Sequence, residues 1–203
     1  MKVLFTGLGS IGQRHLRNLR KLLGDSVEIF AYRVKREVPM LNDQLNVVEG
    51  RLVKDEYGVI EFDDLDKALA QKPEIVFVTN PTSLHIEIAR KAAEAGSHLF
   101  IEKPLGASDV GVDELIKLVD QKRLVALVAY QLRFHPGLIQ VSSWLKEERI
   151  GQLLFANLLL GEYLPSFHPY EDYRKTYPAL KRLGGGVVLS QIHEFDYALW
   201  LFG

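Results

Sequence analysis

The chain has 203 residues, of which 47% are hydrophobic and 25% are charged, so it can hold one complete domain and part of a second. Its net charge of −1 gives no reason to expect binding to nucleic acid or to an anionic membrane. The absence of cysteine excludes disulfides and thiolate chemistry. The six histidines lack metal-binding spacing, so we expect no metal site. Since no signal peptide and no long apolar run is visible, we expect a cytoplasmic protein.

Strand and helix patterns alternate through the first 130 residues. Short apolar runs predict strands at 2–5, 27–32, 74–79, 98–102 and 124–130, the last apolar on both faces as suits a covered strand. Helical spacing predicts helices around 16–23, 63–70, 83–95 and 112–119. Between them, the stretch 40–63 is ambiguous, with a short helix followed by strands around 51–53 and 58–62. This βαβ rhythm predicts an α/β fold with a doubly wound parallel sheet.

The pattern changes after Pro136. It predicts a helix over 138–145, a long strand over 151–164 and a final apolar helix from about Leu189 to Phe202. A lone strand with helices cannot close a second sheet. We therefore divide the chain into a Rossmann domain over 1–125 and a partial second α/β (α+β) domain over 126–203, which we expect to be truncated.

Three glycines follow the first predicted strand in a G-x-G-x-x-G pattern and open the first helix. Gly7 permits the tight turn, Gly9 lets the backbone approach a pyrophosphate, and Gly12 lets the helix pack closely on the strand. The helix N-terminus then offers free N–H groups and the positive end of its dipole to phosphates. The alternative is a plain strand-to-helix turn, but the position at the first strand favours a dinucleotide site.

The end of the second predicted strand bears on which dinucleotide binds. An acidic residue usually stands there to bind the ribose 2′-hydroxyl of NAD. Here Tyr32 and Arg33 occupy the place, and Lys35 and Arg36 follow. A guanidinium favours the 2′-phosphate of NADP, so we expect NADP rather than NAD. The alternative is a solvated basic loop.

Two later strands also end in polar residues, where ligands of doubly wound sheets bind. The first is followed by Thr79–Asn80–Pro81 and the second by Glu102–Lys103–Pro104. A lysine beside a cofactor can polarise a substrate oxygen or transfer a proton. The alternatives are helix-capping residues at the first end and an ordinary exposed lysine at the second.

The C-terminal segments hold two further candidates. His193 shares a face of the last predicted helix with Asp196 and could act as a general acid or base. The alternative is a half-buried histidine bonded to a carboxylate. The aromatic and basic segment could present Tyr173, Arg174 and Tyr177 to a polar substrate, or it could be a surface connection.

Taken together, these segments resemble the glucose-fructose oxidoreductase / inositol dehydrogenase (Gfo/Idh/MocA) family. The resemblance rests on five stretches in order: GLGSIGQRHLRNL, TNPTSLH, EKP, YQLRFHPGL and GGGVVLSQIHEFDYALWLFG. It implies NAD(P)-dependent hydride transfer at a hydroxyl or keto carbon of a sugar, cyclitol or sugar derivative. It also implies a small-molecule partner and a homo-oligomer formed through a C-terminal sheet, with no nucleic acid or membrane partner.

The resemblance also implies roles for single residues. Lys103 and His193 would be catalytic, and Arg133 would lie near the active site. Together with Tyr173 and Arg174 of the aromatic and basic segment, Arg133 and His193 are the candidate substrate-binding residues. The implied dinucleotide-binding residues are Gly7, Gly9, Ser10, Ile11, Gly12, Tyr32, Arg33, Thr79, Asn80, Pro81, His85, Glu102 and Lys103.

One departure from the family pattern bears on catalysis. Many members carry an aspartate three or four residues before the histidine, where this chain has Ser190 and Leu189. Serine cannot hold a negative charge at neutral pH, so Asp196 or Glu194 would have to orient His193. A catalytically silent dinucleotide-binding or regulatory protein of the same fold is therefore the second hypothesis.

Overall fold

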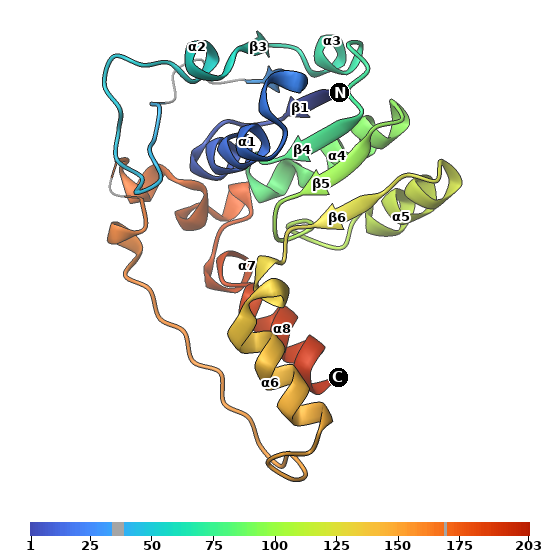
Figure 1. Ribbon diagram of the computed structural model, residues 1–203, viewed down its shortest axis with the longest axis vertical. Coiled ribbons are helices and arrows are strands. Elements are labelled where there is room, and N and C mark those ends of the chain that lie inside the picture. Colours follow the sequence, from blue (N-terminus) through green and yellow to red (C-terminus); the bar gives the residue numbers. More distant parts are fainter. Residues whose placement is uncertain (34–38, 169) are drawn as a thin grey trace.

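The computed structural model describes residues 1–33, 39–168 and 170–203, and its centre is one parallel sheet (Figure 1). The six strands are β1 (Lys2–Phe5), β2 (Glu28–Tyr32), β3 (Val59–Phe62), β4 (Ile75–Val78), β5 (His98–Ile101) and β6 (Ala126–Val128). Their order is β3-β2-β1-β4-β5-β6, and every neighbouring pair is parallel. The strand order reverses between β1 and β4, which is where such folds place a ligand. The doubly wound Rossmann fold is thus confirmed.

Helices cover both faces of this sheet. The helices are α1 (Ser10–Leu23), α2 (Val53–Tyr57), α3 (Leu65–Leu69), α4 (His85–Glu94), α5 (Val112–Gln121), α6 (Pro136–Lys146), α7 (Val187–Ser190) and α8 (His193–Phe202). Buried residues of α1 and α2 pack on one face, and those of α3, α4 and α5 pack on the other. Because strand side chains alternate, β1 sends Val3 and Phe5 to the α1 face and Leu4 to the α4 face. Each such burial stabilises the fold by about 2 kcal/mol.

A row of phenyl rings crosses the sheet close to its carboxyl edge. Phe5, Phe77 and Phe100 are register partners on β1, β4 and β5. Their centroids are 4.6 Å apart at each step, and the rings are stacked. This packing holds the ends of the three central strands at fixed positions, so the loops that follow them start from a rigid base.

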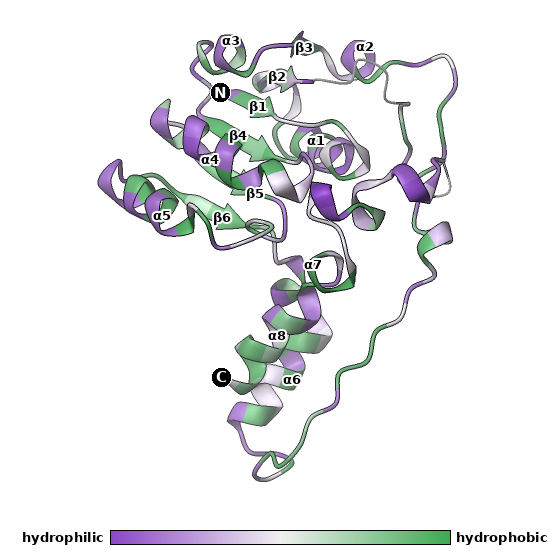
Figure 2. Cartoon of the chain, turned by 180° about the vertical axis from the view of Figure 1, so that it is seen from behind, coloured by the Kyte–Doolittle hydropathy of each residue, from purple (hydrophilic) through white to green (hydrophobic). Residues whose placement is uncertain are grey.

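Several local predictions are wrong. Val53 begins a helix, so the stretch 51–53 is not a strand. The last strand, β6, lies at the sheet edge, where Leu127 is exposed instead of covered on both sides. Residues 151–163 are extended but form no strand (Figure 2). A strand needs a hydrogen-bonding neighbour, and none of the described strands pairs with this stretch.

After that extended stretch, the chain returns to the sheet through four short 3₁₀ helices. These are η4 (Leu164–Ser166), η5 (Tyr173–Lys175), η6 (Tyr177–Ala179) and η7 (Lys181–Leu183). Gly184 then packs so closely that an added Cβ would lie 2.8 Å from the Cβ of Thr82, which begins η2 (Thr82–Leu84). The predicted final helix is interrupted at Gln191 (φ −105°, ψ 39°) and becomes α7 and α8. The return brings the start of α8 to the carboxyl edge of the sheet.

Candidate active site

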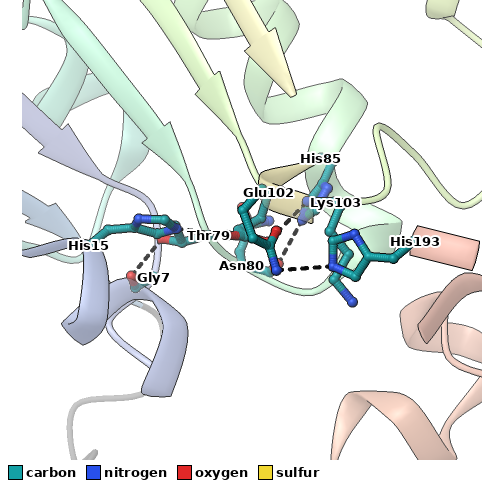
Figure 3. A network of polar contacts seen from close by, with 9 residues as sticks. Gly7, His15, Thr79, Asn80, His85, Glu102, Lys103 and His193 are labelled. Carbon is teal, nitrogen blue, oxygen red and sulfur yellow. Dashed lines mark hydrogen bonds and ion pairs between the residues drawn. The ribbon is translucent and has the colours of Figure 1, made fainter. Parts of the chain in front are cut away.

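The carboxyl ends of β1, β4 and β5 carry the predicted site residues (Figure 3). Gly7 follows β1, Thr79 and Asn80 follow β4, and Glu102 and Lys103 follow β5. Parallel strands place these loops at one edge, so residues far apart in the sequence face a common space. The start of α8, with His193, approaches this edge from the C-terminal part of the chain (Figure 3).

The glycine loop is closely packed at two of its glycines and open at the third. A Cβ on Gly12 would lie 2.1 Å from the carbonyl oxygen of Gly7, and one on Gly7 would lie 2.9 Å from that of Thr79. The hydroxyl of Thr79 donates a 2.7 Å hydrogen bond to the Gly7 carbonyl and locks the turn. A Cβ on Gly9 would meet nothing within 4 Å. Among the described residues, none but its chain neighbours lies within 4 Å of that position, and the Tyr170 side chain hydrogen-bonds the neighbouring Ser10.

The first turn of α1 completes this cradle. The helix begins at Ser10, and Gly9 is its N-cap. Because glycine has no side chain, Gly9 does not cap the first amides of the helix. Ser10 and Ile11 are half-buried. The first N–H groups of a helix have no partner within the helix and carry partial positive charge. The geometry of this cradle is compatible with a dinucleotide pyrophosphate, which Gly7, Gly9 and the amides of Ser10 and Ile11 would hold.

At the end of β2, the side chains of Tyr32 and Arg33 both contact other parts of the chain. Tyr32 is half-buried and packs against the core. The guanidinium of Arg33 forms an ion pair with Glu61 of β3. Glu61 of β3 lies opposite Ala31 of β2 in the sheet register, so the ion pair joins these two neighbouring strands. Lys35 and Arg36 lie outside the described residues.

The turn after β4 is tied to the turn after Lys103 by a buried histidine. His85 is 1% exposed, and its two ring nitrogens lie 2.8 Å from the carbonyl oxygens of Asn80 and Pro104. Burial lowers the pKa of His85 below its usual value, although both carbonyls oppose the shift. The Asn80 side chain accepts a 3.0 Å hydrogen bond from the Thr6 hydroxyl. Pro81 is half-buried. His85 therefore lies beneath the edge and fixes the two loops that bracket it.

Lys103 points towards the C-terminal part of the chain. Its ammonium donates a 2.7 Å hydrogen bond to the backbone carbonyl of Ser190. Burial lowers the pKa of Lys103, and the carboxylates of Glu102, Glu162 and Glu194 oppose that shift. The lysine is thus a partly desolvated ammonium surrounded by acidic groups, and not the exposed lysine of the alternative interpretation.

His193 is the first residue of α8. Its side chain faces the sheet edge (Figure 3). Its Nε2 lies 3.1 Å from the side-chain nitrogen of Gln131, and the ring of Tyr130 meets it edge to face. Burial lowers the pKa of His193, and the positive charge of Lys103 lowers it further. Among the described residues, its Nδ1 is buried with no hydrogen-bond partner. The imidazole is therefore favoured in its neutral form.

The orienting carboxylate expected beside His193 is already engaged elsewhere. Asp196 accepts a bidentate pair of bonds from Arg133, with Nε–Oδ2 at 2.9 Å and Nη2–Oδ1 at 2.8 Å. Arg133 therefore joins η3 (Gln131–Phe134) to α8. One carboxylate oxygen of Glu194 is buried and has no hydrogen-bond partner among the described residues. The same is true of the hydroxyl oxygen of Ser190.

The residues of the aromatic and basic segment differ in burial and in their partners. Tyr177 is half-buried, and desolvation together with the carboxylate of Glu102 raises its pKa to about 12. Tyr173 is half-buried in η5. Arg174 is exposed and its guanidinium pairs with Asp172 at 2.9 Å.

Gln131 and His15 are among the residues at the site that the sequence reasoning missed. Gln131 contacts His193, and His15 of α1 contacts Glu102 at 2.7 Å. His15 follows Gly12 by three positions, so helical spacing places it on the same side of α1. That spacing alone does not identify the carboxylate it meets.

Comparison with known proteins shows the family of this chain. Residues 1–130 match the GFO_IDH_MocA family, described as an oxidoreductase family with an NAD-binding Rossmann fold. The uncharacterized oxidoreductase sll0816 of Synechocystis is 31% identical over 70% of this chain and 38% of its own length. The myo-inositol 2-dehydrogenase of Thermotoga maritima is 26% identical over 100% of this chain and 55% of its own length.

Solved structures share the fold. The WlbA dehydrogenase of Chromobacterium violaceum, solved with NADH and UDP-GlcNAcA, superposes with a TM-score of 0.73 at 21% identity, over 100% of this chain and 55% of that one. The chain spans about half or less of the length of these relatives. In the described part of the chain, no helix is both long and apolar enough to cross a membrane.

Proposed function

The chain belongs to the Gfo/Idh/MocA oxidoreductase family, and from that premise we propose that the protein transfers hydride between a nicotinamide dinucleotide and a CH–OH carbon of a sugar, a cyclitol or a sugar derivative. One observation carries the proposal. The side chains of Lys103 and His193 lie close together at the sheet edge that also carries the glycine loop (Figure 3). A positive group and a proton acceptor beside a dinucleotide site are what oxidation of an alcohol needs.

Each residue then has a distinct task. When bound, the nicotinamide supplies the hydride acceptor for oxidation and the donor for reduction. His193 accepts the hydroxyl proton at a ring nitrogen, because its lowered pKa keeps it neutral near pH 7. The ammonium of Lys103 stabilises the oxygen as negative charge develops on it. In the reverse direction, His193 returns the proton to that oxygen.

The C-terminal part, from residue 126, would supply the substrate side of the site. Tyr177 is half-buried, and the charge of Glu102 acts on its hydroxyl, which makes it a candidate for contact with the substrate. Tyr173 and Arg174 would lie further out. Arg133 would act by holding α8, since its guanidinium is already bound to Asp196.

For the dinucleotide, we propose a preference for NADP. The support is the Arg33 guanidinium at the end of β2, where charge-assisted bonds to a 2′-phosphate form. Its ion pair with Glu61 competes with a 2′-phosphate, so the preference would be moderate.

The test is a fluorescence titration of the chain with NADPH and NADH, followed by turnover assays. The panel contains myo-inositol, scyllo-inositol, levoglucosan and a UDP-N-acetylhexosaminuronic acid, the classes named for relatives. We expect dissociation constants between about 1 μM and 1 mM and turnover on one class. Failure of both dinucleotides to bind would overturn the proposal.

A second function is favoured by one observation, the serine at position 190. Ser190 offers Lys103 a backbone carbonyl and not a carboxylate. If both dinucleotides bind and no member of the panel is turned over, the chain is a dinucleotide-binding protein that has lost catalysis.

A further inference from the structure

We propose that His15 is a positioning residue that holds Lys103 in register with the bound dinucleotide, through the carboxylate of Glu102. This inference rests on the proposed function. It concerns a contact between α1 and the end of β5, two elements that are far apart in the sequence (Figure 3).

The contact is short and protected from solvent. The Nε2 atom of His15 lies 2.7 Å from Oε1 of Glu102, and the two side chains are 17% and 11% exposed. In the proposed arrangement, Nε2 carries the ring proton and donates it to the Glu102 carboxylate, whose oxygens are the acceptors. Such a charge-assisted bond is roughly twice as strong as a bond between neutral groups.

The second oxygen of the same carboxylate holds the backbone of the catalytic lysine. Oε2 of Glu102 accepts a 3.0 Å hydrogen bond from the N–H of Lys103. The N–H of Glu102 donates in turn to the carbonyl of Val78 at 2.9 Å, which fixes the residue to β4. The carboxylate therefore bridges His15 and the main chain of Lys103.

The imidazole of His15 has little freedom to move. It meets the ring of Phe100 edge to face at 4.9 Å and lies 5.8 Å from the ring of Phe77. Both phenyl rings belong to the stacked row across the sheet. The ring packing orients Nε2 towards Glu102, so the hydrogen bond starts from a defined position.

The consequence follows from two positions on α1, its N-terminus and His15. Its N-terminus forms the phosphate cradle at Gly9, and its side chain at His15 fixes the main chain of Lys103. One rigid helix thus sets the place of the dinucleotide and the place of the lysine. Misplacement of reacting groups by about 1 Å can lower a rate about 100-fold, so this common anchor serves catalysis directly.

The experiment separates the hydrogen bond from the ring packing. His15→Phe keeps an aromatic ring against Phe77 and Phe100 but removes the donor, whereas His15→Gln keeps an N–H donor and loses the ring. A matched control is His98→Phe, since His98 lies at the opposite end of β5 and accepts a bond from the Val125 N–H. The readout is hydrogen exchange and chemical shift of the Lys103 backbone amide, measured by NMR in the full chain with NADH.

We expect His15→Phe to speed exchange of the Lys103 amide by roughly 10-fold or more, because Glu102 no longer holds it. His15→Gln restores wild-type exchange to within about 3-fold, and His98→Phe leaves it unchanged. The affinity for NADH stays within about 2-fold throughout, because the glycine loop is untouched. With a substrate in hand, His15→Phe lowers kcat about 10-fold while the KM for the dinucleotide is retained.

An unchanged Lys103 amide in His15→Phe overturns the proposal, as does equal damage in His15→Phe and His15→Gln, which would assign the effect to packing. If His15→Phe fails to fold, Glu102→Gln is measured instead, and an unshifted Lys103 amide there overturns the proposal. These readouts need no turnover. Failure of the wild-type chain to bind either NADPH or NADH would contradict the proposed function, and that binding is measured separately.

Discussion

Lys103 and Ser190 stand 87 positions apart and are joined by a 2.7 Å hydrogen bond from the lysine ammonium to the serine carbonyl. This bond connects the end of a Rossmann strand to the short helix that precedes His193. It gives Lys103 a fixed direction, and it brings the C-terminal part of the chain to the dinucleotide edge. Several measurements test what this arrangement does.

The glycine loop offers a matched pair of substitutions. Gly12→Ala forces a Cβ to within 2.1 Å of the Gly7 carbonyl, so we expect it to destabilise the fold by at least about 2 kcal/mol. Gly9→Ala meets no atom within 4 Å, so the fold survives. Its methyl group intrudes where a pyrophosphate would lie, and the affinity for the dinucleotide falls about 10-fold or more. Thermal unfolding and NADH titration distinguish the two, and full binding by Gly9→Ala would refute the cradle.

Removal of the Lys103 ammonium tests its catalytic role. We expect Lys103→Met to lower turnover by at least about 100-fold, since the developing negative charge loses its stabilising partner. Dinucleotide affinity stays within about 3-fold, because the phosphate cradle is separate. Lys122→Met is the matched control, for Lys122 also donates to a backbone carbonyl, that of Glu94, but away from the site. Comparable turnover in both variants would contradict the assignment.

The protonation of His193 can be followed by NMR titration of its ring protons. Burial and Lys103 lower its pKa, so we expect a midpoint below the ordinary value of 6.5. Lys103→Met raises the midpoint towards 6.5, and Glu194→Gln lowers it further, because that carboxylate favours the charged ring. Glu171→Gln, which removes a partner of His168, is the control.

The lowered pKa of His193 also sets the direction in which the free energy of unfolding changes with pH. The pKa of His193 is lower in the folded state than in the unfolded state. At pH values between these two pKa values, the unfolded state therefore binds the proton more readily. The neutral ring therefore makes its full contribution to the free energy of unfolding above about pH 6.5. That contribution is lost as the pH falls through the pKa of His193 in the folded state. A midpoint above 6.5 in the wild-type chain would show that His193 is not the neutral proton acceptor.

Arg33 and Glu61 test the choice of dinucleotide. We expect Arg33→Ala to weaken NADPH binding by about 10-fold and NADH binding by less than about 2-fold, because only NADP has the 2′-phosphate. Glu61→Gln removes a competing anion from Arg33 and should strengthen NADPH binding about 3-fold. Parallel titrations of the three proteins decide the point. Equal losses for both dinucleotides in Arg33→Ala would assign the arginine to folding and not to specificity.

The chain's periodicity and glycine pattern determined much of this protein. Alternating apolar runs predicted the sheet, and the positions of Gly7, Gly9 and Gly12 predicted the cradle, because turn chemistry and helix spacing act over a few residues. The same local reasoning failed at residues 151–163, where a strand-like pattern has no neighbouring strand to bond. It also missed the break at Gln191, which makes His193 the first residue of a helix and not an interior one.

Only the tertiary structure decided which of those residues meet. His15 and Glu102 are as far apart in sequence as Lys103 and Ser190, and each pair is joined by a bond of 2.7 Å. The tertiary structure also showed that Asp196 serves Arg133 and not His193. Local propensity carries no information about contacts over such separations, because they depend on how the sheet stacks its strands and where the chain returns to its edge.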